Sequence, residues 1–246
     1  MSQPSKLSRR TLLGTAGALL ARAQPARPEI VIIVADGPVL ANCIEFTHAW
    51  AACPEPKGTR TALLSGCFPH AGAAELGARY VTGPIAPRDT DIVVITSAAP
   101  GRVPLRIRHP RLISKPREED FLISHVDVMP TLLGLSGLEI PGGLHGRDHS
   151  ALLLDGHGAR PESIYAEGNL GLPAEWRMIV RGLDRIVFNR SLKITHLYNL
   201  GVDPREEEDL VDDPASELKR AGLRALLKEW IRRTEDRMDA SGLKRR

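Results

Sequence analysis

The sequence of 246 residues has few aromatic side chains, which make up only 4% of it. Its formal net charge of +3 is small, and much of the basic excess lies near the two ends, within residues 6–10 and 244–246. Surfaces that bind nucleic acid combine a basic patch with aromatic side chains on which bases stack. No such stripe occurs in the sequence, and we therefore expect no nucleic acid among its partners.

Cysteine is scarce as well. Cys43, Cys53 and Cys67 are the three cysteines of the chain. An odd count leaves at least one thiol free even where disulfides can form. The sequence has no C-x-x-C pair and no zinc-finger spacing. We therefore expect all three cysteines to be small buried or half-buried residues.

Long hydrophobic runs are also missing. The apolar run at residues 11–21 is shorter than the ~20 residues that a membrane-spanning helix needs, so no stable membrane span is expected. Basic residues precede this run and Ala21-Arg22-Ala23 follows it, which is typical of an export signal. Arg9-Arg10 makes the signal similar to a twin-arginine one. Residues 1–27 therefore predict export by the twin-arginine machinery to the periplasm or the outside of a bacterial cell. The alternative is an uncleaved amphipathic start.

Two β-branched runs predict parallel strands that are buried on both faces. Residues 30–35 end at Asp36-Gly37, and residues 91–97 end at Ala98-Ala99. Ligands of open α/β sheets bind at the carboxyl ends of such strands. Asp36 is therefore a candidate ligand for a metal or a substrate, the alternative being a turn aspartate before a glycine. The second strand end carries no ligating side chain.

Residues 52–66 combine a proline-rich turn with a short helix. The prolines before the helix prevent regular structure there, and Thr59 is predicted to cap the helix N-terminus. Lys57 and Arg60 lie beside that N-terminus, where backbone N–H groups and the helix dipole favour an anion. The simpler interpretation is a capped surface helix with two solvated cations.

The segments that follow the helix are predicted to form two loops, one short strand and a second helix. Residues 69–87 and 141–158 are rich in turn formers and are expected to be loops. His145 and His149 lie in the second loop, where glycines argue against the helix that would bring both rings onto one metal ion. Pro104 confines the alternating residues 103–108 to a sheet edge or a strand start, and residues 126–135 predict a helix.

The last third of the chain has a different residue pattern. Short strands joined by turns between residues 162 and 200 predict an antiparallel meander. Residues 214–236 predict a final helix, with an apolar stripe that packs on the meander. We expect an acidic run at residues 206–209 to be solvated.

Four blocks of the sequence resemble bacterial sulfatases of the alkaline-phosphatase-like superfamily, and they occur in the family order. Residues 30–36 resemble the first strand with its metal-binding aspartate, and residues 46–70, which begin Phe-Thr-His-Ala-Trp-Ala-Ala-Cys-Pro, resemble the active-site signature. The end of the catalytic domain is resembled by residues 102–105 together with 124–133. The C-terminal subdomain is resembled by residues 176–206.

The resemblance implies an α/β fold. We expect a truncated alkaline-phosphatase-like sheet flanked by helices in residues 28–158, with internal deletions. A small antiparallel β-meander with one helix is expected to follow in residues 159–246. The chain is shorter than such sulfatases, with segments missing after Asp36 and between residues 70 and 91.

The resemblance also implies chemistry. Such sulfatases cleave sulfate esters with a formylglycine made from cysteine or serine, beside a divalent cation that is usually calcium. Counted back from Arg60, the modified residue falls at Pro56, which cannot become formylglycine. Gly37 and Ala98-Ala99 occupy further positions of the family's acidic and amide ligands. Calcium needs six or more oxygen ligands, and Asp36 alone cannot supply them.

The sequence thus predicts a sulfatase-family protein with little or no catalysis, whose substrate class is a sulfate ester or another small anion. The candidate catalytic residues are Thr59 and Arg60, the candidate anion-binding residues are Lys57 and Arg60, and the candidate metal ligand is Asp36. One alternative uses the Thr59 hydroxyl as a nucleophile on phosphate or sulfate esters. Others are a non-catalytic module that binds anions or sulfated glycans, and a decayed product that folds poorly.

Overall fold

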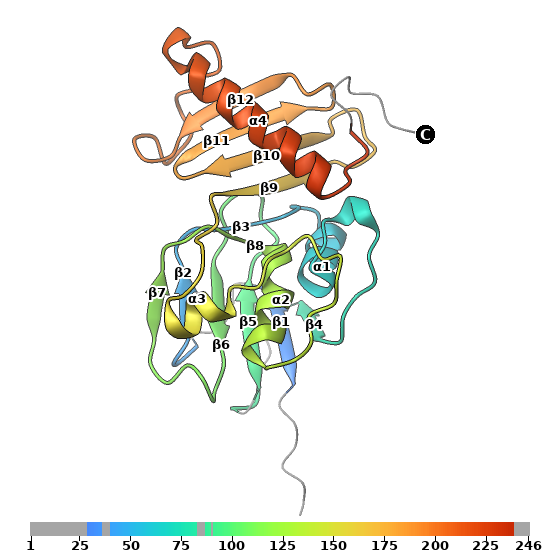
Figure 1. Cartoon of the computed structure of the whole chain (residues 1–246), viewed down its shortest axis with the longest axis vertical. Helices are drawn as coiled ribbons and strands as arrows, with labels where there is room; N and C mark the ends of the chain where they lie inside the picture. The colour runs from blue at the N-terminus through green and yellow to red at the C-terminus, as the bar shows by residue number, and fades with distance from the viewer. Residues whose placement is uncertain (1–28, 36–39, 83–86, 90, 239–246) are drawn as a thin grey trace, which may run out of the picture.

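The computed structural model describes residues 29–35, 40–82, 87–89 and 91–238. They form a six-stranded sheet with helices and, stacked on one end of it, a four-stranded antiparallel sheet crossed by the last helix (Figure 1). The predicted fold class is confirmed. No helix in these ranges has the length and apolar character needed to cross a membrane.

The six-stranded sheet has the order β4-β1-β5-β6-β2-β7. Its two predicted buried strands are central and parallel, with Val34 opposite Thr96. β4 also runs parallel to β1, whereas β6 is antiparallel to both of its neighbours. The strands are β1 (Ile30–Val34), β2 (Ile44–Phe46), β4 (Arg79–Thr82), β5 (Ile92–Thr96), β6 (Leu105–Arg108) and β7 (Arg117–Glu119).

Three helices pack on one face of this sheet, namely α1 (Pro56–Ser65), α2 (His125–Leu135) and α3 (Ser150–Asp155). Leu63 of α1, Leu132 of α2 and Leu153 of α3 share one buried cluster with Ile32 and Val94 of the sheet. A short 3₁₀ turn, η1 (Pro69–Ala71), follows α1. β-branched residues face both sides of β1 and β5, which is why the middle of β1 and all of β5 are buried.

The C-terminal part is the predicted meander and helix. Its strands β9 (Ser163–Gly168), β10 (Trp176–Arg181), β11 (Asp184–Asn189) and β12 (Ile194–Asn199) pair in the order β12-β11-β10-β9. After a 3₁₀ turn, η2 (Pro214–Ser216), comes α4 (Glu217–Arg233). Leu223, Leu227 and Trp230 of α4 are buried against this sheet, as the apolar stripe predicts.

The two parts are joined by a shared cluster of buried side chains and by backbone hydrogen bonds. Phe68, which follows α1, and Val126 of α2 belong to the same cluster as Trp230. The backbone N–H of Glu167 in β9 donates to the carbonyl of Ala52, at 3.0 Å. The short strands β3 (Ala49–Trp50) and β8 (Ile123–Ser124) pair with each other at this junction (Figure 1).

Three predictions about local structure need correction or sharpening. The predicted loop at residues 69–87 contains β4, which forms because β1 offers it a parallel partner. The predicted loop at residues 141–158 contains α3, whose Leu153 completes the core. Pro104 precedes β6, which is an inner strand, so the strand-start alternative holds and the edge does not.

Candidate functional site

The carboxyl ends of β1 and β5 lie at one edge of the sheet, where the sequence places the family's metal ligands. The N–H of Ala35 donates to the carbonyl of Thr96, at 3.1 Å, so the two strand ends stay paired. Asp36, the predicted metal ligand, lies outside the described residues. Beyond β5, Ala98 is half-buried and Ala99 is exposed, and neither has a side-chain oxygen to offer a cation.

A histidine that the sequence analysis did not single out lies at this edge. His125 opens α2 and is 1% exposed, and its Nε2 is 3.0 Å from the Thr96 hydroxyl. Its Nδ1 has no hydrogen-bond partner among the described residues. Burial lowers the pKa of His125 to about 4, so the ring is neutral at pH 7. The only signal in the sequence is its place at a helix start in the third resemblance block.

Helix α1 begins earlier than predicted. Its N-cap is Glu55 and Pro56 is its first residue, where a missing N–H costs no hydrogen bond. The prediction that Thr59 caps the helix is therefore wrong. Thr59 lies inside the first turns and is fully buried, and its hydroxyl donates to the carbonyl of Cys53 at 2.7 Å. A hydroxyl held in this way points into the protein and away from solvent.

The two predicted anion-binding cations lie on the outer side of α1. Lys57 is exposed. Arg60 makes two hydrogen bonds to Glu75, of 2.8 and 2.7 Å, and its guanidinium carbon lies 4.8 Å from the centroid of the Tyr80 ring. Glu75 already neutralises the charge of Arg60. Thr59 and Arg60 thus face different sides of the helix, and the structure does not bring them together around one ligand.

The cysteines are buried and free, in agreement with the sequence prediction. The thiol of Cys53 donates to a carboxylate oxygen of Glu55, at 2.5 Å. Burial is the largest cause that raises the pKa of Cys53 far above its ordinary value, so the reactive thiolate is suppressed. Gly58 packs directly on this sulfur, because a Cβ there would lie only 2.3 Å from it.

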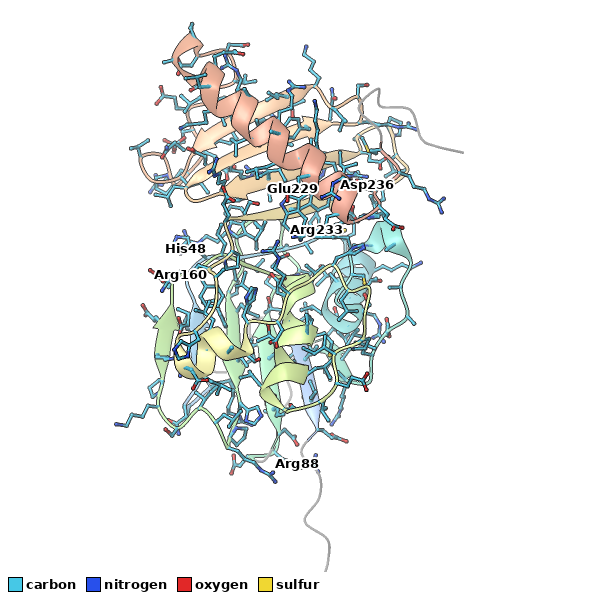
Figure 2. All side chains as sticks on the ribbon, viewed as in Figure 1. His48, Arg88, Arg160, Glu229, Arg233 and Asp236 are labelled. Carbon is cyan, nitrogen blue, oxygen red and sulfur yellow. The ribbon has the colours of Figure 1, made fainter. Side chains whose placement is uncertain are left out.

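A buried charged cluster lies at the junction of the two parts and was not found from the sequence. Nδ1 of His70 is 2.6 Å from a Glu167 carboxylate oxygen, and its Nε2 is 2.9 Å from the carbonyl of Thr234. Arg177 of β10 donates to both carboxylate oxygens of Asp236, at 2.6 and 3.1 Å. Figure 2 shows Asp236 just beyond the end of α4.

Ligand atoms of His70, Glu167 and Asp236 all lie within 4.8 Å of one another, a spacing that a metal ion could bridge. The charges around them do not fit a divalent cation. The Asp236 carboxylate already accepts from Arg177 and, at 2.7 Å, from the hydroxyl of Tyr165. A cation placed there would face the Arg177 charge at short range.

Both ring nitrogens of His70 face acceptor oxygens, so a protonated ring, which donates from both nitrogens, matches this cluster. Burial alone would lower the pKa of His70, but the hydrogen bond and the charge of Glu167 outweigh it and raise that pKa above the ordinary value. The cluster is therefore a set of buried ion pairs between β9, β10, η1 and the end of α4. Its geometry ties the C-terminal part to the segment that follows α1.

His145 and His149 do not converge on a common point. The ring of His145 stacks near those of Phe68 and His70, with centroids 5.7 and 5.5 Å away. The ring of His149 instead lies 5.3 Å from that of Phe121. The two histidines thus serve different parts of the core.

The fold is one that solved sulfatases share, and a family model matches the later part of the sequence. The family described as "N-sulphoglucosamine sulphohydrolase, C-terminal" matches residues 97–233, more than half of the chain. The chain therefore belongs to this family, within the alkaline-phosphatase-like superfamily. No curated protein matches the sequence.

Solved structures of sulfatases share the fold at low sequence identity. BT1596, a 2-O GAG sulfatase, is 13% identical with a TM-score of 0.68, over 85% of this chain and 93% of that chain. BT4656, solved with D-glucosamine-2-N,6-O-disulfate, is 20% identical with a TM-score of 0.55. BT33494S-sulf, from work on glycosaminoglycan metabolism by Bacteroides thetaiotaomicron, is 21% identical with a TM-score of 0.51.

The last two similarities are partial. They cover 64% and 60% of this chain, which spans only 37% of BT4656 and 38% of BT33494S-sulf. Similarity at this level of identity shows the fold alone. What those proteins bind and cleave therefore does not carry over to this chain.

Proposed function

We propose that this chain is a sulfatase homologue that binds a sulfated or otherwise anionic ligand without hydrolysing it. The observation that carries the proposal is the residue at the signature position. Pro56 stands where the sequence resemblance puts the family's formylglycine. It is the first residue of α1 and is exposed, and it has no side chain that could be converted. Hydrolysis through a covalent intermediate needs an activated nucleophile at that point.

The neighbouring nucleophiles do not replace it. Thr59 is buried and its hydroxyl donates to a carbonyl, while the buried Cys53 thiol donates to Glu55. A hydroxyl nucleophile also needs a base or a metal close to it. This arrangement argues against the alternative in which Thr59 attacks a phosphate or sulfate ester.

The residues at the sheet edge do not fit the calcium that the family implies. A calcium ion takes six to eight oxygen ligands, mostly from carboxylates. Among the described residues at this edge, the Thr96 hydroxyl is hydrogen-bonded to His125 and the Ser97 hydroxyl accepts from the N–H of Ala99. The two alanines that follow have no side-chain oxygen. No catalytic step through a metal is therefore assigned to this chain.

The test is a hydrolysis assay on purified residues 28–246 with calcium added, using an aryl sulfate and N-sulfoglucosamine. We expect no turnover above the buffer rate, from protein that shows a cooperative thermal melt. The melt separates lost catalysis from poor folding. Hydrolysis by the wild type that disappears in Asp36→Ala would overturn the proposal.

We also propose that the protein is exported. The support is the basic start, the apolar run and Ala21-Arg22-Ala23 in residues 1–27. Cell fractionation should find the shortened protein outside the cytoplasm, and replacing Arg9 and Arg10 with lysine should keep it inside. Equal export of that variant would rule out the twin-arginine route.

A further inference from the structure

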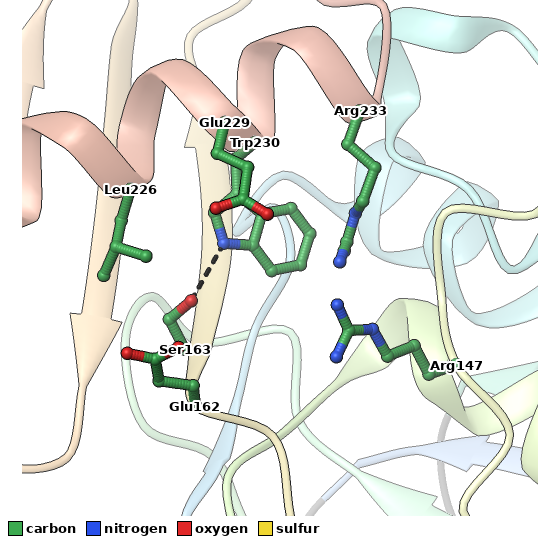
Figure 3. A pocket seen from close by; sticks show the side chains of 7 residues that line it. All are labelled: Arg147, Glu162, Ser163, Leu226, Glu229, Trp230 and Arg233. Carbon is green, nitrogen blue, oxygen red and sulfur yellow. Dashed lines mark hydrogen bonds between the residues drawn. The ribbon is translucent and has the colours of Figure 1, made fainter. Parts of the chain in front are cut away.

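Two arginines face each other across a small pocket where the end of α4 meets the segment between α2 and α3. Figure 3 shows the guanidinium groups of Arg147 and Arg233 on opposite sides of this pocket. Its volume is about 80 Å3, and the first residues of β9 form another wall. The lining residues are Arg147, Glu162, Ser163, Leu226, Glu229, Trp230 and Arg233.

The described residues engage the two guanidinium groups only weakly. No ion pair joins Arg147 or Arg233 to a described residue, and the side chain of Arg233 makes one long hydrogen bond, of 3.5 Å, to the carbonyl of His145. Glu162 pairs with Arg181, at 2.6 Å. Most N–H donors of the two guanidinium groups are therefore free to bind a ligand.

The position of Arg233 is fixed by an aromatic ring. Its guanidinium carbon lies 3.6 Å from the centroid of the Trp230 ring, a cation–π contact. The indole N–H of Trp230 in turn donates to the hydroxyl of Ser163, at 3.1 Å. An arginine held in this way loses little further freedom when it binds an anion.

The charges around the pocket are of both signs. Burial lowers the pKa of Arg233, and the charge of Arg147 lowers it further, whereas Asp127 and Glu229 raise it. The Asp127 carboxylate is already bound by the N–H groups of Ser124 and Arg147, both at 2.8 Å. Glu229 is exposed and stands beside Trp230 (Figure 3), so its negative charge opposes an anion.

We propose that Arg147 and Arg233 bind one tetrahedral oxyanion, a sulfate or phosphate group, between their guanidinium forks. A tetrahedral group presents oxygens to both sides, so both guanidinium groups can donate hydrogen bonds to it, whereas a carboxylate offers two oxygens in one plane. The pocket admits the anionic group and leaves the rest of an ester outside. This inference rests on the binding half of the proposed function and is independent of the loss of hydrolysis.

Isothermal titration of the purified chain with inorganic sulfate, inorganic phosphate and methyl sulfate tests the site. Arg147→Gln should weaken binding at least about tenfold, since one charge-assisted hydrogen bond is worth roughly that much in affinity. Arg147 is exposed, so this variant should fold, and its melting curve checks that it does. Arg160→Gln removes another exposed arginine, which pairs with Asp120, and should leave the affinity unchanged.

Glu229→Gln gives a readout that a structural role would not produce. Removing this negative charge should tighten sulfate binding several-fold, most clearly at low ionic strength. Stronger binding of methyl sulfate than of sulfate would identify an ester as the ligand, and the reverse order would identify the free anion.

The outcomes separate this site from the wider proposal. Sulfate binding that Arg147→Gln and Glu229→Gln leave unchanged would refute this pocket while the proposed function survives. Failure of the wild type to bind any of the three probes would refute both.

Discussion

Replacing Arg177 with methionine removes the cation at the centre of the buried cluster. The guanidinium is 1% exposed and lies 2.6 Å from Asp236 and 3.0 Å from Glu175. Methionine keeps an unbranched apolar stem of similar reach, so most of the packing should survive. The carboxylates, in contrast, stay buried without the charge that faces them.

Removing one partner of a buried ion pair costs ~3–5 kcal/mol, because the charge that remains is left uncompensated. The Tyr165 hydroxyl still donates to Asp236 in the variant, which offsets part of that loss. We therefore expect the free energy of unfolding at pH 7 to fall by about 3–4 kcal/mol. For a chain of this size the melting temperature should fall by roughly 10 °C.

The loss should depend on pH in a defined direction. Burial would raise the pKa of Asp236, but the hydrogen bonds from Arg177 and Tyr165 and the Arg177 charge hold that pKa below its ordinary value. The pair therefore stabilises the wild type above the unfolded pKa of aspartate, and this contribution is lost as the pH falls through the folded pKa. In the variant the burial is unopposed and the carboxyl takes up a proton more easily. The difference in stability should thus shrink between pH 7 and pH 4.

Urea unfolding of wild type and variant, followed by circular dichroism at both pH values, measures this difference. Arg181→Met is the matched control, because Arg181 lies on the same strand and pairs with Glu162 at 2.6 Å, with both side chains more than half exposed. An exposed pair is worth less than about 1 kcal/mol. If the two variants lose equal stability, or if the loss at Arg177 grows on acidification, the reasoning is refuted.

Three further predictions follow from buried groups. The pKa of His70 is raised in the folded protein. Its charge therefore stabilises the protein below the unfolded pKa of about 6.5, and this stabilisation is lost as the pH rises through the folded pKa. Urea unfolding should show that His70→Gln loses more stability at pH 6 than at pH 9. Gly146→Ala places a Cβ 1.9 Å from the carbonyl of Val126 and should cost about 3 kcal/mol in thermal melts, whereas Gly142→Ala meets nothing and should change little. All three thiols, Cys53 included, are free and buried, so Ellman's reagent should label them rapidly only in denaturant.

Local sequence patterns predicted most of the fold, because the main elements carry their signal within a few residues. The β-branched runs of β1 and β5 and the alternation of β9 to β12 needed no long-range information. β4 and α3 were missed for the opposite reason. β4 gains its hydrogen bonds from β1, and six-residue α3 is stabilised through Leu153, so both depend on partners distant in sequence.

The candidate sites were harder to predict than the fold. Threonine is a common N-cap residue, which is why Thr59 was predicted to cap the helix. Proline suits the first helical position, so the helix begins at Pro56 with Glu55 as its N-cap. Arg147 and Arg233 are separated by most of the C-terminal part, and no spacing rule connects them. The contact between His70 and Glu167 likewise joins residues far apart in the chain.

The positions at which we propose that the family's chemistry is lost differ in kind from the positions that hold the fold. Pro56 and Ala99 are exposed and Ala98 is half-buried, and substitutions at such places usually change stability by only about 0.5 kcal/mol. His70 and Arg177 lie in buried ion pairs, where one loss costs several times more. Folding therefore depends on the junction of the two parts and hardly at all on which residue occupies position 56. By the same argument, Pro56→Cys alone should fold well and still hydrolyse no sulfate ester, because the oxygens for a cation would remain missing.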